Sequence, residues 1–301
     1  MKRILGVVLT LLLLCSAWIT INIKLGKSQY SGAIFIRNDG SVDPPNAPIQ
    51  RVGDVYTVAG NIDGNITVQK DNIVIDGLGY TIQGSTLNLS AISTATIGID
   101  IQNRVNVTIK NVQIKSFVNG IHLLNSSENT IIGNILAENV DGVRLDSSSN
   151  NNVVGNNITL NFHGIHPATN NKFYHNNLIN NADRQVFIGP SDGFNSWDDG
   201  YPEGGNYWSN YTGVDAKNGL GQDATGSDGI GDTPYIMDSN NIDRYPLVAA
   251  FHEQAQPDQI FWLYLAISLI VIVAAIVIGI LFFMKKAKGK PEKEVSRQEV
   301  L

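Results

Sequence analysis

The sequence predicts an all-β protein: a right-handed parallel β-helix with an N-terminal cap, an irregular C-terminal module and a C-terminal transmembrane helix. A 22-residue period places Gly98, Gly120, Gly142 and Gly164 in one column. A fixed period of this length is typical of solenoids. Within each row, apolar and polar residues alternate, as in Gly142-Val143-Arg144-Leu145. This alternation indicates strands that point one side chain inward and the next outward.

Columns of asparagine support the same fold. Two columns are formed by Asn129, Asn151 and Asn171, and by Asn134, Asn156 and Asn176. Asparagine tolerates left-handed backbone at turns, and stacked carboxamides bond the residue above and below. No helical period appears within a row, which argues against a leucine-rich repeat. We interpret most of this asparagine as scaffold rather than chemistry.

The N-terminal segment, residues 1–27, is predicted to be a secretion signal or an uncleaved signal anchor. Lys2 and Arg3 precede an uncharged run that ends at Ile23. Residues 28–65 are expected to form cap strands over the open end of the solenoid.

The repeats are predicted to occupy residues 66–190, with the first coil starting at Ile66. The spacing of 34 residues between the equivalent positions Ile75 and Ile109 implies an inserted loop near 85–96.

The C-terminal part is predicted to anchor the protein in the membrane. Residues 191–250 form a module rich in Gly, Asp and aromatic residues, and 251–259 form a spacer. Residues 260–283 carry no charge, and at about 1.5 Å per residue they can span a ~30 Å hydrocarbon core. The basic tail, 284–301, is expected in the cytoplasm, with the ectodomain outside. The N-terminal segment is then either cleaved or a second anchor.

Charge and cysteine content limit the possible partners. Between residues 28 and 257 lie 11 of the 21 Lys and Arg residues but 23 of the 27 Asp and Glu residues. So acidic a domain does not suit nucleic acid, which needs a basic surface. The single cysteine, Cys15, lies in the N-terminal apolar segment. Stability of the ectodomain must therefore come from the stacked core rather than from disulfides.

Two motifs resemble a known family. The Asn- and Gly-rich coils, such as Ser149–Ile158, resemble NosD-type β-helix proteins, which are described as periplasmic copper-binding proteins or carbohydrate-binding and sugar-hydrolase (CASH) domains. The Gly204–Ser209 and Gly226–Tyr235 stretches resemble the tail that follows such coils in archaeal surface proteins. The resemblance covers roughly residues 32–247. It implies a pectin-lyase-like solenoid at the cell surface.

One outward column is the main candidate for ligand binding. It contains Asp100, His122, Arg144 and His166, with Asp141 and Asp146 nearby. Parallel β-helices can host polysaccharide lyases and hydrolases, and hydrolases need paired carboxylates at a defined separation. No complete catalytic set stands out in the sequence, so we assign no catalytic residue.

Two metal sites are considered. The family resemblance implies copper, and the imidazoles of His163, His166 and His175 are the candidate ligands. The carboxylates of Asp223, Asp228 and Asp232 lie in a glycine-rich segment where oxygen ligands suit Ca²⁺. Asp-Gly turns form without a metal as well.

Aromatic residues and sequons complete the candidates. Trp197, Tyr207 and Trp208 could stack on sugars or plug the open C-terminal end of the solenoid, and the plug is favoured. Six Asn-x-Ser/Thr sequons are candidate glycosylation sites in an exported protein. They are Asn65, Asn88, Asn106, Asn125, Asn157 and Asn210.

The sequence therefore favours a membrane-anchored extracellular protein with a binding or structural role, such as recognition of cell-envelope glycans or adhesion. A polysaccharide lyase or hydrolase and a copper-binding accessory protein are the alternatives.

Overall fold

The computed structural model describes residues 29–84, 96–190, 192–252 and 268. In these stretches up to residue 252 the regular structure is entirely β. The described part of the chain contains no helix with the length and apolar character needed to cross a membrane. The predicted signal segment, the loop over 85–95, sequon Asn88 and the predicted spanning segment, apart from Ser268, lie outside the described residues.

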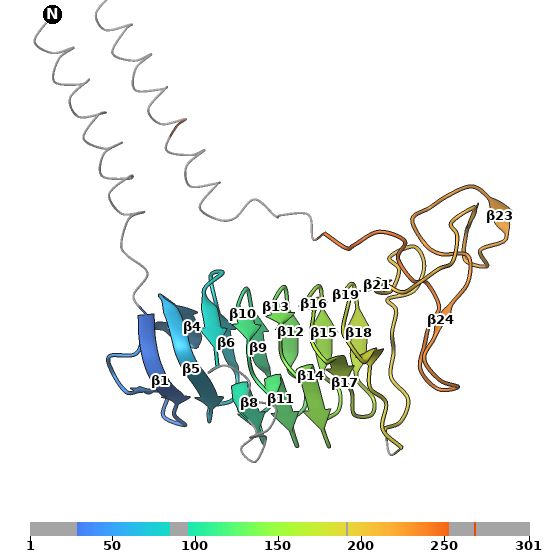
Figure 1. Ribbon diagram of the computed structural model, residues 1–301. Helices are drawn as coiled ribbons and strands as arrows, with labels where there is room; N and C mark the ends of the chain where they lie inside the picture. Colours follow the sequence, from blue (N-terminus) through green and yellow to red (C-terminus); the bar gives the residue numbers. More distant parts are fainter. Residues whose placement is uncertain (1–28, 85–95, 191, 253–267, 269–301) are drawn as a thin grey trace, which may run out of the picture. The chain divides into compact units, whose positions relative to one another are not determined.

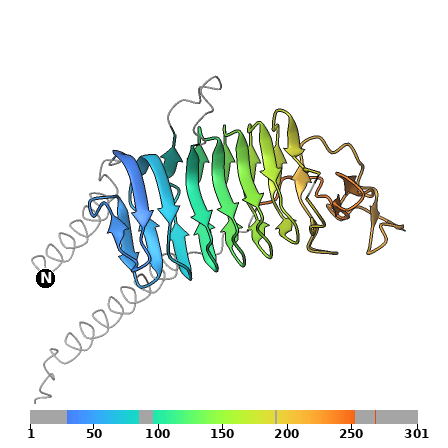
Figure 2. The ribbon, with the colours of Figure 1, turned by 90° about the horizontal axis from the view of Figure 1, so that it is seen from below.

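The strands form three faces of a parallel β-helix, and successive coils lie side by side in sequence order (Figures 1 and 2). Face A contains β1 (Gln29–Ile36), β5 (Asn61–Val68), β8 (Ile97–Gln102), β11 (Asn119–Leu124), β14 (Asp141–Asp146), β17 (His163–His166) and β20 (Arg184–Val186). Face B contains β3 (Ile49–Val52), β4 (Val55–Val58), β6 (Ile73–Asp76), β9 (Val107–Lys110), β12 (Thr130–Ile132), β15 (Asn152–Val154) and β18 (Lys172–Tyr174). Face C contains β7 (Thr81–Gln83), β10 (Gln113–Lys115), β13 (Ile135–Ala137), β16 (Asn157–Thr159), β19 (Asn177–Ile179) and β21 (Tyr207–Trp208).

Faces A and C meet at β5, whose first half pairs with β7 and whose second half pairs with β8. Four short strands of the C-terminal module form two antiparallel hairpins: β22 (Lys217–Asn218) with β23 (Ala224–Thr225), and β24 (Tyr235–Ile236) with β25 (Ile242–Asp243).

Parallel stacking begins earlier in the chain than predicted. Along its whole length β1 pairs in parallel with β5, and β4 pairs in parallel with β6. In this N-terminal region β2 (Val42–Asp43) and β3 pair antiparallel, with β1 and β4 respectively. The first coil is therefore formed by residues predicted from the sequence to be a cap. The sequence did not reveal this coil because its strands are not separated from those of the next coil by 22 residues.

The inward columns form a continuous apolar core. Four columns are fully or almost fully buried, as their period predicted: Ile99, Ile121, Val143 and Ile165; Ile101, Leu123 and Leu145; Ile109, Ile131, Val153 and Phe173; Ile114, Leu136, Ile158 and Leu178. Burying one such side chain stabilises the fold by about 1.5–3 kcal/mol. The core is therefore the main source of stability.

The glycine column marks where neighbouring coils approach most closely. A Cβ atom on Gly120 would lie 2.5 Å from the carbonyl oxygen of Gly142, and one on Gly142 would lie 2.6 Å from that of Gly164. Such contacts are too short for a real Cβ, so only glycine fits this column.

Asparagine ladders occupy the three corners of the coils from Asn129 onward. Asn134 donates its carboxamide N–H to Asn156 Oδ1 over 3.0 Å, and Asn156 donates to Asn176 over 3.0 Å. The same oxygen of Asn156 also accepts the backbone N–H of Asn134. The predicted ladder through Asn129 and Asn151 has the same geometry.

A third ladder was not predicted, although it has the same period. It runs through Asn139, Asn161 and Asn181, with carboxamide contacts of 3.1 Å. With it, every corner of the coil satisfies its buried backbone groups in the same way, as burial requires.

The last coil extends beyond the predicted end of the repeats at residue 190. Ser196 forms a parallel bridge with Lys172, and Trp208 pairs with Leu178. Trp197 and Trp208 thus continue two inward columns, and Trp197 stacks on Phe173 with ring centroids 4.5 Å apart. The insertion between the two tryptophans lengthens this coil and hides its period in the sequence.

Candidate functional site

The outward side of face A carries a connected network of acidic and basic side chains. The strand register places His122 beside Asp100 and Arg144, and places Arg144 beside His166. The four residues of the predicted column are therefore neighbours on successive strands. Two further outward columns on the same face add Asp141 and Asp146.

In the N-terminal half of this network, Asp146 connects His122 with Arg144. His122 Nε2 lies 2.8 Å from Asp146 Oδ2, and Arg144 Nε donates to the same oxygen over 2.8 Å. Burial acts to raise the pKa of Asp146, but the hydrogen bonds from Arg144 and His122 outweigh it and lower the pKa. The carboxylate is therefore held in its charged form.

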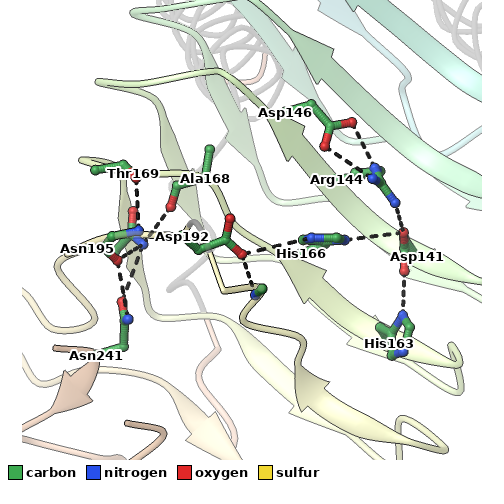
Figure 3. A network of polar contacts seen from close by, with 12 residues as sticks. Asp141, Arg144, Asp146, His163, His166, Ala168, Thr169, Asp192, Asn195 and Asn241 are labelled. Atoms are coloured by element: carbon green, nitrogen blue, oxygen red, sulfur yellow. Dashed lines mark hydrogen bonds and ion pairs between the residues drawn. The ribbon is translucent and has the colours of Figure 1, made fainter. Parts of the chain in front are cut away.

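Asp141 joins the C-terminal half. It is almost fully buried, with His163 Nδ1 at 2.7 Å from Oδ1, Arg144 Nη1 donating to Oδ2 over 3.2 Å, and His166 Nδ1 at 3.8 Å from Oδ2. Burial acts to raise the pKa of Asp141, but the neighbouring imidazoles of His166 and His163 lower it below its ordinary value. Figure 3 shows His166 lying between Asp141 and Asp192.

The network continues into two acidic residues that the sequence did not single out. His163 Nε2 lies 3.3 Å from Asp183 Oδ2, and His166 Nε2 lies 3.9 Å from Asp192 Oδ2. Asp192 also accepts the backbone N–H of Gly189 over 2.6 Å. Both residues lie beyond β17, where the 22-residue period no longer applies, so no column could have revealed them.

Asp100, at the other end of the network, has a different environment. Burial raises the pKa of Asp100, and the charge of His122 opposes this only in part. His122 Nδ1 is 3.8 Å from Asp100 Oδ1, too long for a hydrogen bond. His122 Nδ1 and Asn119 Oδ1 are both buried without a hydrogen-bond partner among the described residues.

A pocket of about 730 Å³ adjoins the network, and we call it the end pocket. It lies between β20 and the β24–β25 hairpin, and Asp183 and Asp192 line it directly. Asn210, Tyr235 and Asp238 add an amide, a phenol and a third carboxylate to its wall. The network thus ends in a pocket whose walls are rich in groups that bind hydroxyls.

The predicted copper ligands are not brought together. His163 and His166 share Asp141, but His175 lies at the corner between faces B and C. There its ring stacks on Phe251 with centroids 4.2 Å apart, and its Nε2 lies 2.9 Å from the carbonyl oxygen of Glu203. His163 and His166 both lie on β17 rather than on either side of a turn, and His175 follows β18 later in the same coil.

Two of the predicted calcium ligands, Asp228 and Asp232, accept hydrogen bonds from N–H groups of the protein, and Asp223 is exposed. Asp228 accepts the backbone N–H of Ile230 and a carboxamide N–H of Gln222, and Asp232 accepts two backbone N–H groups. Throughout the described stretches, no three His, Cys, Asp or Glu side chains are grouped so that they could hold a metal ion.

The tryptophans of the last coil are buried. Trp197 and Trp208 are 0% and 1% exposed, so neither offers a ring face to a sugar. Trp197 Nε1 donates to Asn241 Oδ1 over 2.9 Å, and Trp208 Nε1 donates to Asp243 Oδ2 over 2.8 Å. The two side chains plug the end of the solenoid, whereas Tyr207 is half-buried on face C.

Four of the predicted sequon asparagines are exposed: Asn106, Asn125, Asn157 and Asn210. Asn65 is half-buried on β5. Asn210 is the one that also lines the end pocket, where the Tyr235 hydroxyl donates to its Oδ1 over 3.2 Å.

This fold and its outward polar network define the class of the protein, a parallel β-helix repeat protein with three strands in each regular coil. Comparison with family models then identifies the family. The chain belongs to the NosD family, described as periplasmic copper-binding protein (NosD), whose model matches residues 34–213.

Comparison with solved structures gives only distant likenesses. The catalytic domain of a GH87 α-1,3-glucanase with tetrasaccharides is 16% identical, with a TM-score of 0.27 over 59% of this chain and 38% of that one. A second such domain, with nigerose, is 13% identical, with a TM-score of 0.31 over 64% and 43%. The chain thus spans about two fifths of these domains. A search of curated proteins gave no match.

Copper, which the family description implies, does not fit the described residues. The imidazole nitrogens of His163 and His166 face carboxylates, His175 stacks on Phe251, and the sole methionine between residues 29 and 252, Met237, packs partly buried against the core. No set of soft or imidazole donors converges.

Proposed function

We propose that the protein binds a neutral glycan of the cell envelope in the end pocket and along the adjoining polar network of face A. The observation that carries this proposal is that Asp183 and Asp192 belong to both the pocket wall and the network. A glycan chain longer than the pocket would therefore extend over His163 and His166 and would contact polar side chains along its whole length.

The chemistry of the walls supports this ligand class. Carboxylates and amides accept hydrogen bonds from sugar hydroxyls, and Tyr235 offers a half-buried ring beside them. The one cation of the pocket, Arg184, is already paired with Asp183 over 2.6 Å. Acidic polysaccharides would meet three carboxylates, so neutral glycans are favoured.

The proposal includes the location inferred from the sequence. The spanning segment 260–283 would hold the β-helix outside the membrane, which agrees with the periplasmic description of the family. Binding and retention of envelope glycans, rather than their cleavage, is the proposed role.

A binding screen of the purified full-length chain against neutral polysaccharides tests the proposal. Ser239 is exposed and lines the end pocket, so Ser239→Trp should fill the pocket and weaken binding by at least about tenfold. Asp192→Asn should weaken it as well. Thr225→Trp, at an exposed position on β23, is the control.

Unchanged binding by Ser239→Trp would overturn the assignment to the end pocket. Release of shorter sugars over time, abolished by Asp100→Asn, would instead support the hydrolase alternative.

A further inference from the structure

A second depression lies on the corner between faces A and B, and we call it the corner pocket. Its volume is about 450 Å³, and none of its lining residues lines the end pocket. Successive coils supply its walls through Asn150 and Asn152, Asn170 and Lys172, and Phe194. The network of face A does not include any of these side chains.

Phe194 is the unusual residue of this corner. The backbone bonds Asn150 N–H to Asn170 O and Asn170 N–H to Phe194 O place the three residues in one column. The two preceding coils carry asparagine in this column, whereas the last one carries a phenylalanine that is 66% exposed. An exposed aromatic ring beside polar groups offers an apolar face for the C–H side of a sugar ring.

Amides and one ammonium group surround this ring. Asn170 donates to Asn150 Oδ1 over 2.6 Å, which fixes the two carboxamides as a pair. Asn152 and Lys172 lie side by side on β15 and β18. Within the described residues, the Asn152 amide makes no hydrogen bond and the Lys172 ammonium has no ion-pair partner.

The charge of the corner pocket is opposite to that of the end pocket. No Asp or Glu lines it, although the whole chain has a net charge of −6. Its one charged lining group is Lys172, exposed and free to bind an anion. The acidic member of the corner column is Glu128, one coil before Asn150 and so about 10 Å from the coil of Lys172. Asp192, two residues before Phe194, lies outside the lining and accepts the backbone N–H of Gly189 next to His166.

We propose that the corner pocket is a separate carbohydrate site that binds an acidic saccharide. Phe194 stacks on the sugar ring, Asn150, Asn152 and Asn170 bind its hydroxyls, and Lys172 pairs with its carboxylate. The inference rests on the proposed function only in that both ligands are carbohydrates. The corner pocket has different lining residues from the end pocket and prefers a ligand of the opposite charge.

Titration of the purified full-length chain with trigalacturonate tests the site, with maltotriose as the neutral comparison. We expect the chain to bind trigalacturonate, with added salt weakening the affinity. Lys172→Gln and Phe194→Ala should each weaken binding by about tenfold or more. Lys217→Gln and Leu220→Ala are matched controls, since both side chains are exposed and lie outside the pocket.

Three results would overturn the inference: no trigalacturonate binding by the wild-type chain, equal loss in the control variants, or Lys172→Gln and Phe194→Ala variants that bind as well as wild type. The Ser239→Trp variant separates this test from that of the end pocket. Ser239→Trp should leave trigalacturonate binding intact. If the proposed function is wrong, the Ser239→Trp variant will bind neutral glycans as wild type does, and this result leaves the trigalacturonate test unaffected.

Discussion

The indole Nε1 of Trp208 donates a hydrogen bond to Asp243 Oδ2 over 2.8 Å, and this contact joins the last coil to the segment that closes it. The same oxygen accepts the backbone N–H of Asn206, where one Asn ladder ends. Trp197 makes the corresponding bond to Asn241. Two ladders and two core columns therefore end together around β25, which supplies side chains in place of a further coil.

Asp243 should make the stability of the protein depend on pH. Burial raises the pKa of Asp243 from 3.8 to about 7, and the N–H groups of Asn206, Trp208 and Tyr245 oppose this only in part. A raised pKa means that the folded state binds the proton more tightly than the unfolded state. The contribution to stability is thus complete below pH 4 and is lost as pH rises through 7, by roughly 4 kcal/mol at most.

Denaturant unfolding of wild type and Asp243→Asn between pH 5 and pH 8 checks this. The stability of wild type relative to Asp243→Asn should fall as pH rises, because the amide does not titrate. A constant difference between wild type and Asp243→Asn would rule out the titration of Asp243.

The Asn ladders should contribute strongly to stability. Asn156→Ala removes the acceptor of both the backbone and carboxamide N–H groups of Asn134, and removes a donor to Asn176. These groups are buried, so the loss should cost about 2–4 kcal/mol in the free energy of unfolding.

Asn152→Ala is the matched control, since this asparagine lies in the same coil, four residues before Asn156, and its half-buried side chain points away from the core. It should change the free energy of unfolding by less than about 0.5 kcal/mol. Equal costs for the two variants would mean that the ladder adds no stability of its own.

Asp141 should give the opposite pH dependence from Asp243. The pKa of Asp141 lies below its ordinary value of 3.8, so its stabilising contribution is present above pH 4 and is lost as pH falls through the folded-state pKa. Asp141→Asn should cost about 1–3 kcal/mol at pH 7 and should remove this acid sensitivity. Unfolding curves between pH 2.5 and pH 7 check it, and an unchanged acid profile in the variant would contradict the assigned contacts.

Glycosylation at Asn210 should block the end pocket. Because Asn210 lines that pocket, a glycan on its side chain would occupy the space proposed for the ligand. In a host that modifies sequons, Thr212→Ala should restore neutral-glycan binding without changing Asn210 itself. Mass spectrometry would establish whether Asn210 carries a glycan. Equal binding by a modified wild-type chain and by Thr212→Ala would contradict the proposed ligand position.

The sequence predicted those features that repeat. The glycine column at Gly98, Gly120 and Gly142, the inward columns and two Asn ladders all follow from one period, because parallel stacking in register repeats the same environment in every coil. The neighbours Asp100, His122 and Arg144 could be predicted for the same reason.

Contacts that occur only once in the molecule, outside the repeat, could not be predicted from the period. Asp183 and Asp192 reach the network from a segment without the period, and Asn241 and Asp243 bond tryptophans that lie 44 and 35 residues away in sequence. The last coil left one signal, the repeated Asn-x-Trp pattern at Asn195–Trp197 and Asn206–Trp208. It matches Asn171-Lys172-Phe173 in the coil before.

The equivalence of the coils also sets how the molecule can change in length. A duplicated 22-residue segment, such as 127–148, would reproduce every corner bond and core position of its neighbours. It would separate Asp100 from Asp192 by one more step of about 4.8 Å while leaving both ends of the solenoid untouched. Insertion or deletion of coils can therefore change the distance between the two ends of the polar network only in whole steps of about 4.8 Å, in evolution as in design.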